Sequence, residues 1–323
     1  MNEGSATEES VKSRILGALW AGAKKAASTV LFLLKIMVPT SLAVALLGWS
    51  GLLGYIAAFL APLMRIIGLP GEAALAFISG ALLNIYSAIA VMGTLSLTLK
   101  HATILAIMSL TAHNLIVETA VMKSLGSSAL KMALLRIFTA IFAAFVFNLI
   151  LPARLAAIPF SAAMAAEKVA FFAMLAGWAV STLNLVGKVV VFVLAIMEIQ
   201  SLFREFRIMD FLSRILAPFM KIFGLPSDAS FLWIVINVVG YSYGAGIIKS
   251  EYETGKLKPQ DGDLFNHHAG ICHSLLEDTF LYAAVSIPIF WLVVPRLILA
   301  IAVVWLERFR RSHFKKSFRV GTV

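Results

Sequence analysis

The stretch LAPLMRIIGLP at residues 60–70 occurs twice in the chain. Its second copy, LAPFMKIFGLP, occupies residues 216–226, and eight of the eleven positions are identical. Arg65 is replaced by Lys221, so the charge is kept. The two copies are separated by 216 − 60 = 156 positions, about half of the 323 residues. Such an internal duplication is typical of membrane transporters built from two homologous halves.

Each copy predicts a short amphipathic helix at a membrane boundary, with its basic residue on one side. Gly and Pro are expected to end that helix and to turn the chain before the next hydrophobic run. The alternative is a chance match between two apolar helices. Eight identities that run through two Gly-Leu-Pro turns favour a duplication.

The composition is that of a membrane protein. Hydrophobic residues make up 60% of the chain and charged residues only 14%, with a mean hydropathy of +0.92. Several apolar runs are long enough to span a bilayer as helices, and the alternation typical of an outer-membrane barrel is absent. The single cysteine, Cys272, excludes a disulfide framework within one chain. We therefore expect an all-α, polytopic protein in contact with the lipid bilayer.

The net charge of +10 does not indicate a nucleic-acid partner, because the basic residues flank apolar runs. Those after the last run are Arg308, Arg310, Arg311, Lys315, Lys316 and Arg319; those before the first are Lys12, Arg14, Lys24 and Lys25. Basic juxtamembrane segments favour the cytoplasmic side. The acidic start lacks the cationic region of a signal peptide. These features predict a multi-pass protein of the inner (cytoplasmic) membrane with both termini in the cytoplasm.

The duplication divides the chain into a polar tail (1–12), a first repeat (13–155), a second repeat (156–307) and a basic tail (308–323). Each repeat is expected to contain an interfacial segment, a span, a boundary helix, a run with polar residues at its middle, a run with an acid, and a final span. In order these are 13–27, 28–49, 51–67, 73–98, 102–123 and 129–151, and then 166–183, 184–203, 210–223, 229–248, 264–283 and 284–306. They allow roughly eight to ten crossings or re-entrant segments. An odd number per repeat would make the repeats inverted.

A second correspondence lies in the runs that carry an acid. HNLIVET at residues 113–119 aligns with HSLLEDT at residues 273–279, an offset of 160. Asn114 and Glu118, and likewise Ser274 and Asp278, share a helix face if the runs are continuous. A carboxylate within the membrane costs at least ~2.5–3.5 kcal/mol and is by default a functional candidate. The alternative is a neutral, hydrogen-bonded contact between helices.

These acids are predicted to bind the solute or the coupling ion, Asn114 and Ser274 to line the same site, and His113 and His273 to carry protons or act as ligands. On the second repeat, His268, Cys272, His273 and Glu277 recur at helical spacing, which suggests ligands for a divalent metal. The simpler interpretation makes His267 and His268 exposed or capping residues and Cys272 an apolar filler.

The remaining predicted binding residues occupy the middle of two apolar runs. They are Asn84, Tyr86 and Ser87 in the first repeat, and Asn237, Tyr241 and Tyr243 in the second. Polar residues beside Gly240, Gly244 and Gly246 are typical of a broken or re-entrant helix that holds a solute near the midplane. Helix packing through small residues would explain the glycines but not the Asn and Tyr residues.

The run Asn84-Ile85-Tyr86-Ser87-Ala88-Ile89, with Met92-Gly93-Thr94 and the two Gly-Leu-Pro turns, resembles nucleoside-recognition (Gate) domain membrane proteins. These include spore maturation proteins A and B and the Gate segments of bacterial ferrous-iron transporters. The resemblance extends over about residues 13–306. The chain lacks the Cys and Pro of the iron transporters' Cys-Asn-Val-Pro-Ala-Ile-Met stretch and has no recognisable GTPase domain.

Together these features predict a secondary transporter or permease, not an enzyme, with a midplane site between the repeats. The candidate solutes are a divalent metal ion, a nucleoside-like molecule or a small organic ion, and the coupling ion would be H⁺ or Na⁺. The resemblance also implies a homo-oligomer or a second Gate-type membrane protein as a partner. Two other classes remain open: a structural or assembly protein of the spore-maturation type, and a membrane-embedded metal-dependent hydrolase.

Overall fold

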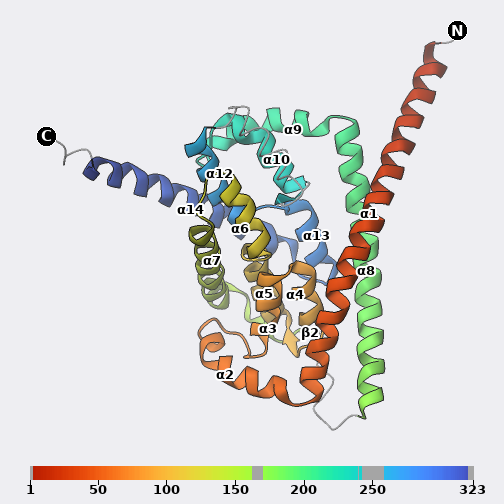
Figure 1. Ribbon diagram of the computed structural model, residues 1–323, viewed down its shortest axis with the longest axis vertical. Coiled ribbons are helices and arrows are strands. Elements are labelled where there is room, and N and C mark those ends of the chain that lie inside the picture. Colours follow the sequence, from red (N-terminus) through yellow and green to blue (C-terminus); the bar gives the residue numbers. More distant parts are fainter. Residues whose placement is uncertain (1–2, 162–169, 239, 242–257, 319–323) are drawn as a thin grey trace.

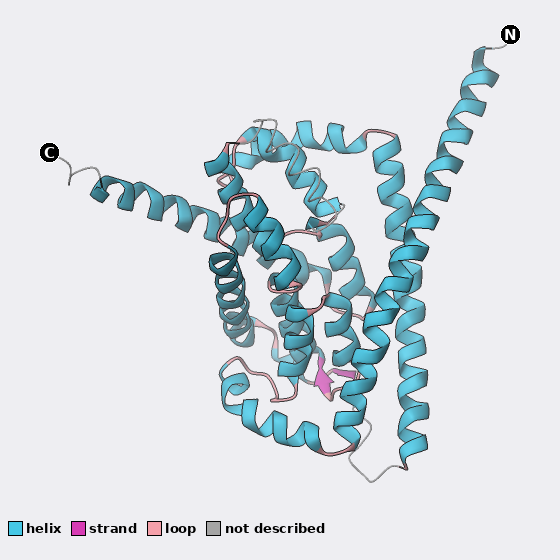
Figure 2. Ribbon diagram, viewed as in Figure 1, coloured by secondary structure: helices cyan, strands magenta, loops and turns pink. Residues whose placement is uncertain are grey.

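The computed structural model describes residues 3–161, 170–238, 240–241 and 258–318, and these are almost entirely helical (Figure 2). Up to residue 161 the α-helices are α1 (Glu3–Trp49), α2 (Leu52–Ile66), α3 (Ala73–Leu82), α4 (Ile85–Met92), α5 (Leu99–Thr111), α6 (Leu115–Ser124) and α7 (Ala129–Ile150). From residue 170 they are α8 (Phe171–Glu205), α9 (Ile208–Leu216), α10 (Ser230–Val238), α12 (Pro259–Ile271), α13 (Leu275–Ala284) and α14 (Ile289–Phe318). Tyr243 lies outside the described residues.

Short elements complete this architecture. Three 3₁₀ turns are η1 (Ala153–Ala156), η2 (Ala217–Lys221) and η3 (Ser227–Ala229). Two strands, β1 (Leu97–Thr98) and β2 (Pro159–Ser161), form a small antiparallel sheet. The sequence did not predict this pairing. It joins the start of α5 to the chain after α7, because Leu97 lies opposite Ser161.

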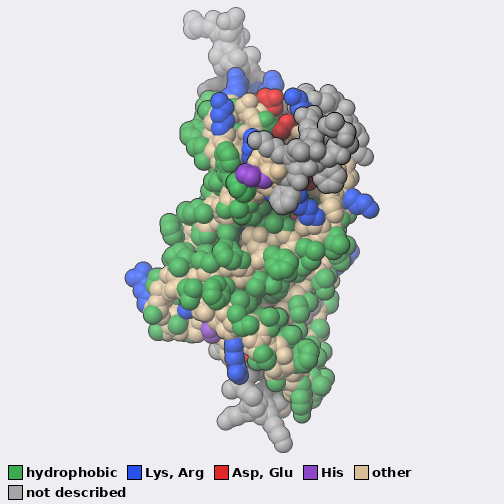
Figure 3. Space-filling model, turned by 90° about the vertical axis from the view of Figure 1, so that its left-hand side faces the viewer, with side chains coloured by type: hydrophobic (Ala, Val, Ile, Leu, Met, Phe, Trp, Pro, Cys, Tyr) green, Lys and Arg blue, Asp and Glu red, His purple; other side chains and the backbone are tan. Residues whose placement is uncertain are grey.

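Within the described residues, four segments are long and apolar enough to cross a membrane: Leu99–Ser124, Ala129–Ile150, Phe171–Glu205 and Ile289–His313. The shorter apolar helices are Tyr55–Ile66, Ala73–Leu82 and Ser227–Val238. Hydrophobic side chains cover much of the middle of the face drawn in Figure 3, and Lys and Arg lie toward its margins. The prediction of a mainly helical membrane protein is confirmed.

The helices α1 and α8 are longer than the sequence predicted. An interfacial segment and a separate span were expected at 13–27 and 28–49, but both lie within α1; α8 likewise includes 171–183 and 184–203. No proline stands at either junction, so nothing there forces the helix to stop. The two helices are neighbours in Figure 1, and they pack closely because Gly22 has no side chain: a Cβ there would lie 2.9 Å from Cα of Glu198.

The repeated motif forms the predicted turn in both places. The glycine that ends each motif helix is left-handed, with φ of 73° at Gly68 and 69° at Gly224. The next leucine closes the turn by donating its amide to the methionine five residues earlier: Leu69 to Met64 (3.0 Å) and Leu225 to Met220 (2.9 Å). This is the hydrogen bond of a Schellman motif, which satisfies a carbonyl group at the helix end. Figure 1 places α2 and α9 at opposite ends of the molecule.

Helix breaks interrupt three of the predicted runs. The run 73–98 breaks between α3 and α4, where the Asn84 side chain caps α4 by accepting from the Ser87 amide (3.0 Å). The run 102–123 breaks between α5 and α6, and the run 264–283 between α12 and α13. The prediction of a broken helix is confirmed for 73–98. Helical i, i+4 spacing does not apply across the other two breaks, where a continuous helix was assumed.

The Gly68 turn yields a prediction about stability. A Cβ at Gly68 would lie 2.1 Å from the Asn148 side chain, and the left-handed backbone adds strain. We expect Gly68→Ala to lower the free energy of unfolding by about 1–2 kcal/mol for the backbone and by roughly 1–3 kcal/mol more for the overlap. Thermal unfolding of the purified protein in detergent measures this loss.

The matched control is Gly51→Ala. Gly51 has a similar φ of 79°, but a Cβ added there would meet no atom within 4 Å. Gly51→Ala should therefore carry only the backbone cost and unfold at a higher temperature than Gly68→Ala. Equal unfolding temperatures for the two variants would contradict the close contact at Gly68.

Candidate functional site

The break between α5 and α6 holds His113 inside the protein. Asn114 adopts a left-handed conformation (φ 47°), and its backbone N–H donates to the Gly80 carbonyl (3.0 Å). The imidazole Nδ1 of His113 lies 2.9 Å from the carbonyl oxygen of Ser109, in the last turn of α5. The backbone and this hydrogen bond therefore fix the ring and leave Nε2 to face the interior.

The break between α12 and α13 holds His273 by matching contacts. Ser274 is left-handed (φ 50°), and its amide donates to the Ile236 carbonyl (2.8 Å). Nδ1 of His273 lies 2.6 Å from the carbonyl oxygen of Ala269. Both histidines are thus presented by a helix break rather than by a continuous helix face.

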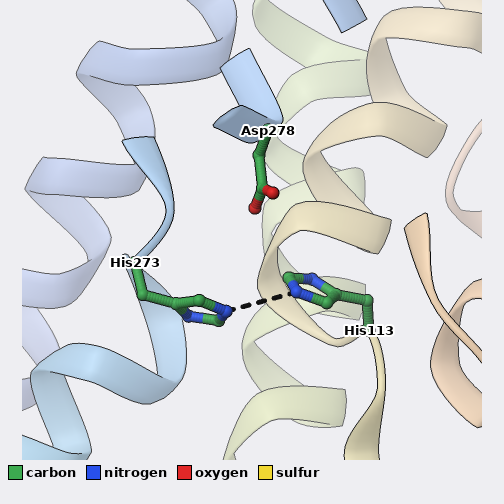
Figure 4. A group of neighbouring side chains, drawn as sticks. All are labelled: His113, His273 and Asp278. Carbon is green, nitrogen blue, oxygen red and sulfur yellow. Dashed lines mark hydrogen bonds between the residues drawn. The ribbon is translucent and has the colours of Figure 1, made fainter. Parts of the chain in front are cut away.

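The two histidines meet in the interior with the two predicted acids. Their Nε2 atoms are 3.2 Å apart, and each also lies 3.2 Å from Oε1 of Glu118. Figure 4 shows the Asp278 carboxylate directed toward the space between the rings, and one ligand atom each of His113, His273 and Asp278 lie within 4.8 Å of one another. All four side chains are buried. The sequence therefore predicted four residues that the structure brings together.

This arrangement requires a positive charge. A carbonyl oxygen can only accept, so Nδ1 of each histidine must carry a hydrogen. A neutral ring then has a lone pair on Nε2, and two such lone pairs would face each other and the Glu118 carboxylate. Three acceptors at 3.2 Å repel one another unless a proton or a metal cation lies among them.

Two buried arginines, Arg136 on α7 and Arg296 on α14, were missed in the sequence. Both side chains are 0% exposed. Arg136 donates to the carbonyls of Thr111 and His113 (3.0 and 2.9 Å), and its Nη1 lies 2.7 Å from Oε2 of Glu118. Arg136 lies within an apolar run, where hydropathy gives no sign of a functional residue. The signal was available, because 296 − 136 = 160 is the offset of the histidines.

Arg296 occupies a similar but looser position. Its Nη2 donates to the His273 carbonyl and lies 3.7 Å from Oδ2 of Asp278. We name the set of His113, His273, Glu118, Asp278, Arg136 and Arg296 the charged cluster. The two acids and the two arginines of this cluster cancel in charge. The positive charge that the histidine pair requires must therefore come from a further proton or a metal cation.

Of the other predicted binding residues, Tyr241 contacts the charged cluster, whereas the side chains of Asn237, Asn84, Ser87 and Tyr86 bond residues outside it. Tyr241 packs against His273, with ring centroids 5.8 Å apart, and its hydroxyl donates to Asn266 (2.8 Å). The Asn237 side chain accepts from the Leu275 amide (3.4 Å) and so supports the start of α13. Asn84 and Ser87 bond to each other at the cap of α4. Tyr86 instead donates to Glu277 (2.5 Å).

The four residues proposed as metal ligands from their spacing have different partners. His268 accepts from the Trp233 indole (2.8 Å), Glu277 bonds Tyr86, and Cys272 is buried in an apolar group with Ile271 and Ala300. His273 alone belongs to the charged cluster. The helix break at 272–274 explains the difference, because it ends the face that the four residues would have shared.

A second ionic group lies on α12 and α14. Asp263, His267 and Glu307 have ligand atoms within 4.8 Å of one another. Basic residues already surround its two acids: Glu307 bonds Lys131, Arg310 and Arg311 (3.1, 2.8 and 2.8 Å), and Asp263 bonds Arg311. This group therefore ties α12, α7 and α14 together.

No protein-family model matches the chain, and no solved structure matches it; the Gate-type resemblance stays a prediction. A curated relative is the Bacillus subtilis (strain 168) protein named uncharacterized membrane protein YvoD, which is 30% identical over 291 residues. The match covers 90% of this chain and 92% of YvoD. Such a match, together with the apolar helices, shows that the chain is a multi-pass membrane protein and belongs to the same family as YvoD.

Proposed function

We propose that this protein is a secondary transporter for a small solute and that the charged cluster holds a cation during the transport cycle. The observation that carries the proposal is the contact of two imidazole Nε2 atoms and one carboxylate oxygen at 3.2 Å. Helix packing alone does not require such a group, and ionisable residues inside membrane segments are costly. Placement at helix breaks is typical of transporter ion sites.

A two-fold construction of the site supports this proposal. The amides after the histidines bond carbonyls 156 positions apart, Gly80 and Ile236, and the histidine rings bond carbonyls 160 positions apart, Ser109 and Ala269. The arginines and the acids repeat at the offset of 160 as well. Boundary helices at opposite ends of the molecule (Figure 1) fit repeats that are inverted relative to each other.

The burial of the cluster supports a cycle of opening and closing. His113, Glu118, His273 and Asp278 are at most 6% exposed, so a solute reaches them only if helices move apart, as in alternating access. Candidate solutes are divalent metal ions, nucleoside-like molecules and small organic ions, with H⁺ or Na⁺ as the coupling ion. A cation is favoured because the site itself requires positive charge.

The two other classes are less well supported. The hydrolase would use His268, Cys272, His273 and Glu277, and these residues have different partners in the structure. A structural or assembly protein could use such a group only as a structural metal site, whereas a site built from two repeats at helix breaks is typical of transporters. Apolar residues of similar size often stabilise a core as well as a buried ion pair does. We therefore propose transport without chemical conversion of the solute.

Replacement of the acids by amides tests the transport site. We expect Glu118→Gln and Asp278→Asn to reduce solute flux in proteoliposomes to the background of empty liposomes, because the amides cannot balance a bound cation. Glu118→Gln also leaves Arg136 without its acid, which costs up to about 3–5 kcal/mol of stability. Size-exclusion chromatography and thermal unfolding separate loss of fold from loss of transport.

A double variant and a control sharpen this test. Glu118→Gln combined with Arg136→Gln removes both charges of the pair, but it also takes the arginine donors from the Thr111 and His113 carbonyls, so it should stay below wild-type stability and recover no flux. Glu277→Gln keeps an oxygen that accepts from Tyr86 and should retain most of the flux. Wild-type flux in both Glu118→Gln and Asp278→Asn would refute the proposed transport site.

The position of the chain ends yields a prediction about topology. The described end of α14 and the start of α1 both lie in the upper half of Figure 1, and basic residues flank both ends of the chain. We propose that both termini are cytoplasmic in the inner membrane. In intact cells, cysteines introduced as Ser5→Cys and Gly321→Cys should both resist an impermeant thiol reagent and react after permeabilisation. Buried Cys272 gives little background, and labelling of either introduced cysteine from outside would contradict the topology.

A further inference from the structure

We infer that His113, His273, Glu118 and Asp278 form a binding site for a divalent transition metal ion such as Zn²⁺ or Fe²⁺. This inference names the class of cation that the charged cluster holds. Only the further statement that this ion is transported, or drives transport, rests on the proposed function. Imidazole and carboxylate groups are the ligands that these metals favour.

The spacing of the ligand atoms fits a tetrahedral metal ion. The Nε2 atoms of the two histidines and Oε1 of Glu118 form a triangle with sides of 3.2, 3.2 and 3.2 Å. A tetrahedral ion with bonds of about 2.0 Å separates its ligand atoms by about 3.3 Å. The triangle therefore has the size of one face of a tetrahedral site.

The orientation of the ligands is also that of a metal site. Metal-bound histidines usually donate their other ring N–H to a carbonyl or carboxylate, which fixes the ring. Both histidines do so here, to Ser109 and Ala269 (2.9 and 2.6 Å). Arg136 holds Oε2 of Glu118 at 2.7 Å, which leaves Oε1 for the metal. The outer contacts of a metal site are thus already in place.

An acceptor without a partner lies beside the triangle. Oδ2 of Asp278 has no hydrogen-bond donor in the described part of the chain, although the residue is only 4% exposed. Arg296 lies 3.7 Å away, too far for a hydrogen bond. A buried, unpaired carboxylate oxygen is unfavourable. Figure 4 shows this carboxylate facing the histidine pair, and one of its oxygens lies within 4.8 Å of a ring nitrogen of each histidine, so a small shift toward a bound ion would make it the fourth ligand.

The second ionic group is a weaker candidate. Its acids, Asp263 and Glu307, bond Lys131, Arg310 and Arg311, so a metal would have to displace several cations. It also offers a single histidine, His267. In the charged cluster, by contrast, the only arginine or lysine that forms an ion pair with a triangle residue among the described residues is Arg136, and it binds the far oxygen of Glu118.

The two sites differ in the number of histidine ligands, and this difference provides the test. Purified protein in detergent is stripped with a chelator, loaded with one equivalent of Zn²⁺, and studied by X-ray absorption spectroscopy. We expect two imidazole ligands and oxygen ligands at about 2.0–2.2 Å. A single imidazole would assign the ion to the group around His267 and overturn the inference, as would the absence of stoichiometric binding. This measurement uses the wild-type protein and so does not depend on variants that fold poorly.

Co²⁺ titration of variants gives an independent check. His113→Ala and His273→Ala should each weaken Co²⁺ binding at least about 100-fold, because loss of a ligand exceeds the usual 10–100-fold effect of an outer contact. His313→Ala removes an exposed histidine on α14 and should bind as wild type does. Equal weakening in all three variants would overturn the inference. Metal binding without Zn²⁺ flux in proteoliposomes would support the metal site but contradict transport of the metal. Flux of another solute without metal binding would overturn the metal site and leave the proposed transport function standing.

Discussion

Unsatisfied backbone carbonyls at the helix breaks are the constraint on which the centre of this protein depends. A membrane interior offers no water to such groups, so a broken helix is stable only where protein donors replace the missing hydrogen bonds. Arg136 supplies them to Thr111 and His113, and Arg296 to His273. A buried guanidinium in turn requires an acid, and Glu118 and Asp278 lie beside the two arginines. The acids then lie next to the histidines.

This chain of requirements gives Glu118 two roles at once. One oxygen balances Arg136 and therefore supports the break between α5 and α6, while the other faces the histidine pair. Removing one partner from a buried pair of charges costs about 3–5 kcal/mol, so chemistry and stability are coupled at this residue. Loss of function at Glu118 is informative only when stability is measured with it.

The sequence was most reliable where local rules decide the structure. The Gly-Leu-Pro turns, the helix break in the run that contains Asn84, and the grouping of Glu118, Asp278 and the two histidines follow from glycine conformation, polar residues within an apolar run and the cost of acids in a membrane. The same sequence reasoning failed where it assumed a continuous helix. The helix break separates His268 and Cys272 from Glu277, so the three residues do not share a helix face. His268 and Glu277 instead bond residues of other helices.

Long-range contacts set the remaining limit. Tyr86 and Glu277 are 191 positions apart, and neither periodicity nor composition relates them. The arginines are a different case, because the repeat offset of 160 links Arg136 to Arg296 although each lies within an apolar run. A duplicated sequence can therefore reveal buried charges that hydropathy hides, provided that every pair of equivalent positions is compared and not the polar segments alone.

The two acids of the charged cluster differ in length, and this difference makes the site asymmetric. Glu118 has one methylene more than Asp278, and it reaches its arginine at 2.7 Å and both histidines at 3.2 Å, whereas Asp278 stays 3.7 Å from Arg296. Two identical acids on equivalent elements would hold the histidine pair equally well from either side. The longer acid removes that equality, because the Nε2 atoms of both histidines lie 3.2 Å from Oε1 of Glu118. Unequal acids in equivalent positions thus give a duplicated site a preferred side, and two states that differ in the contact with Glu118 would bind a cation with different affinities.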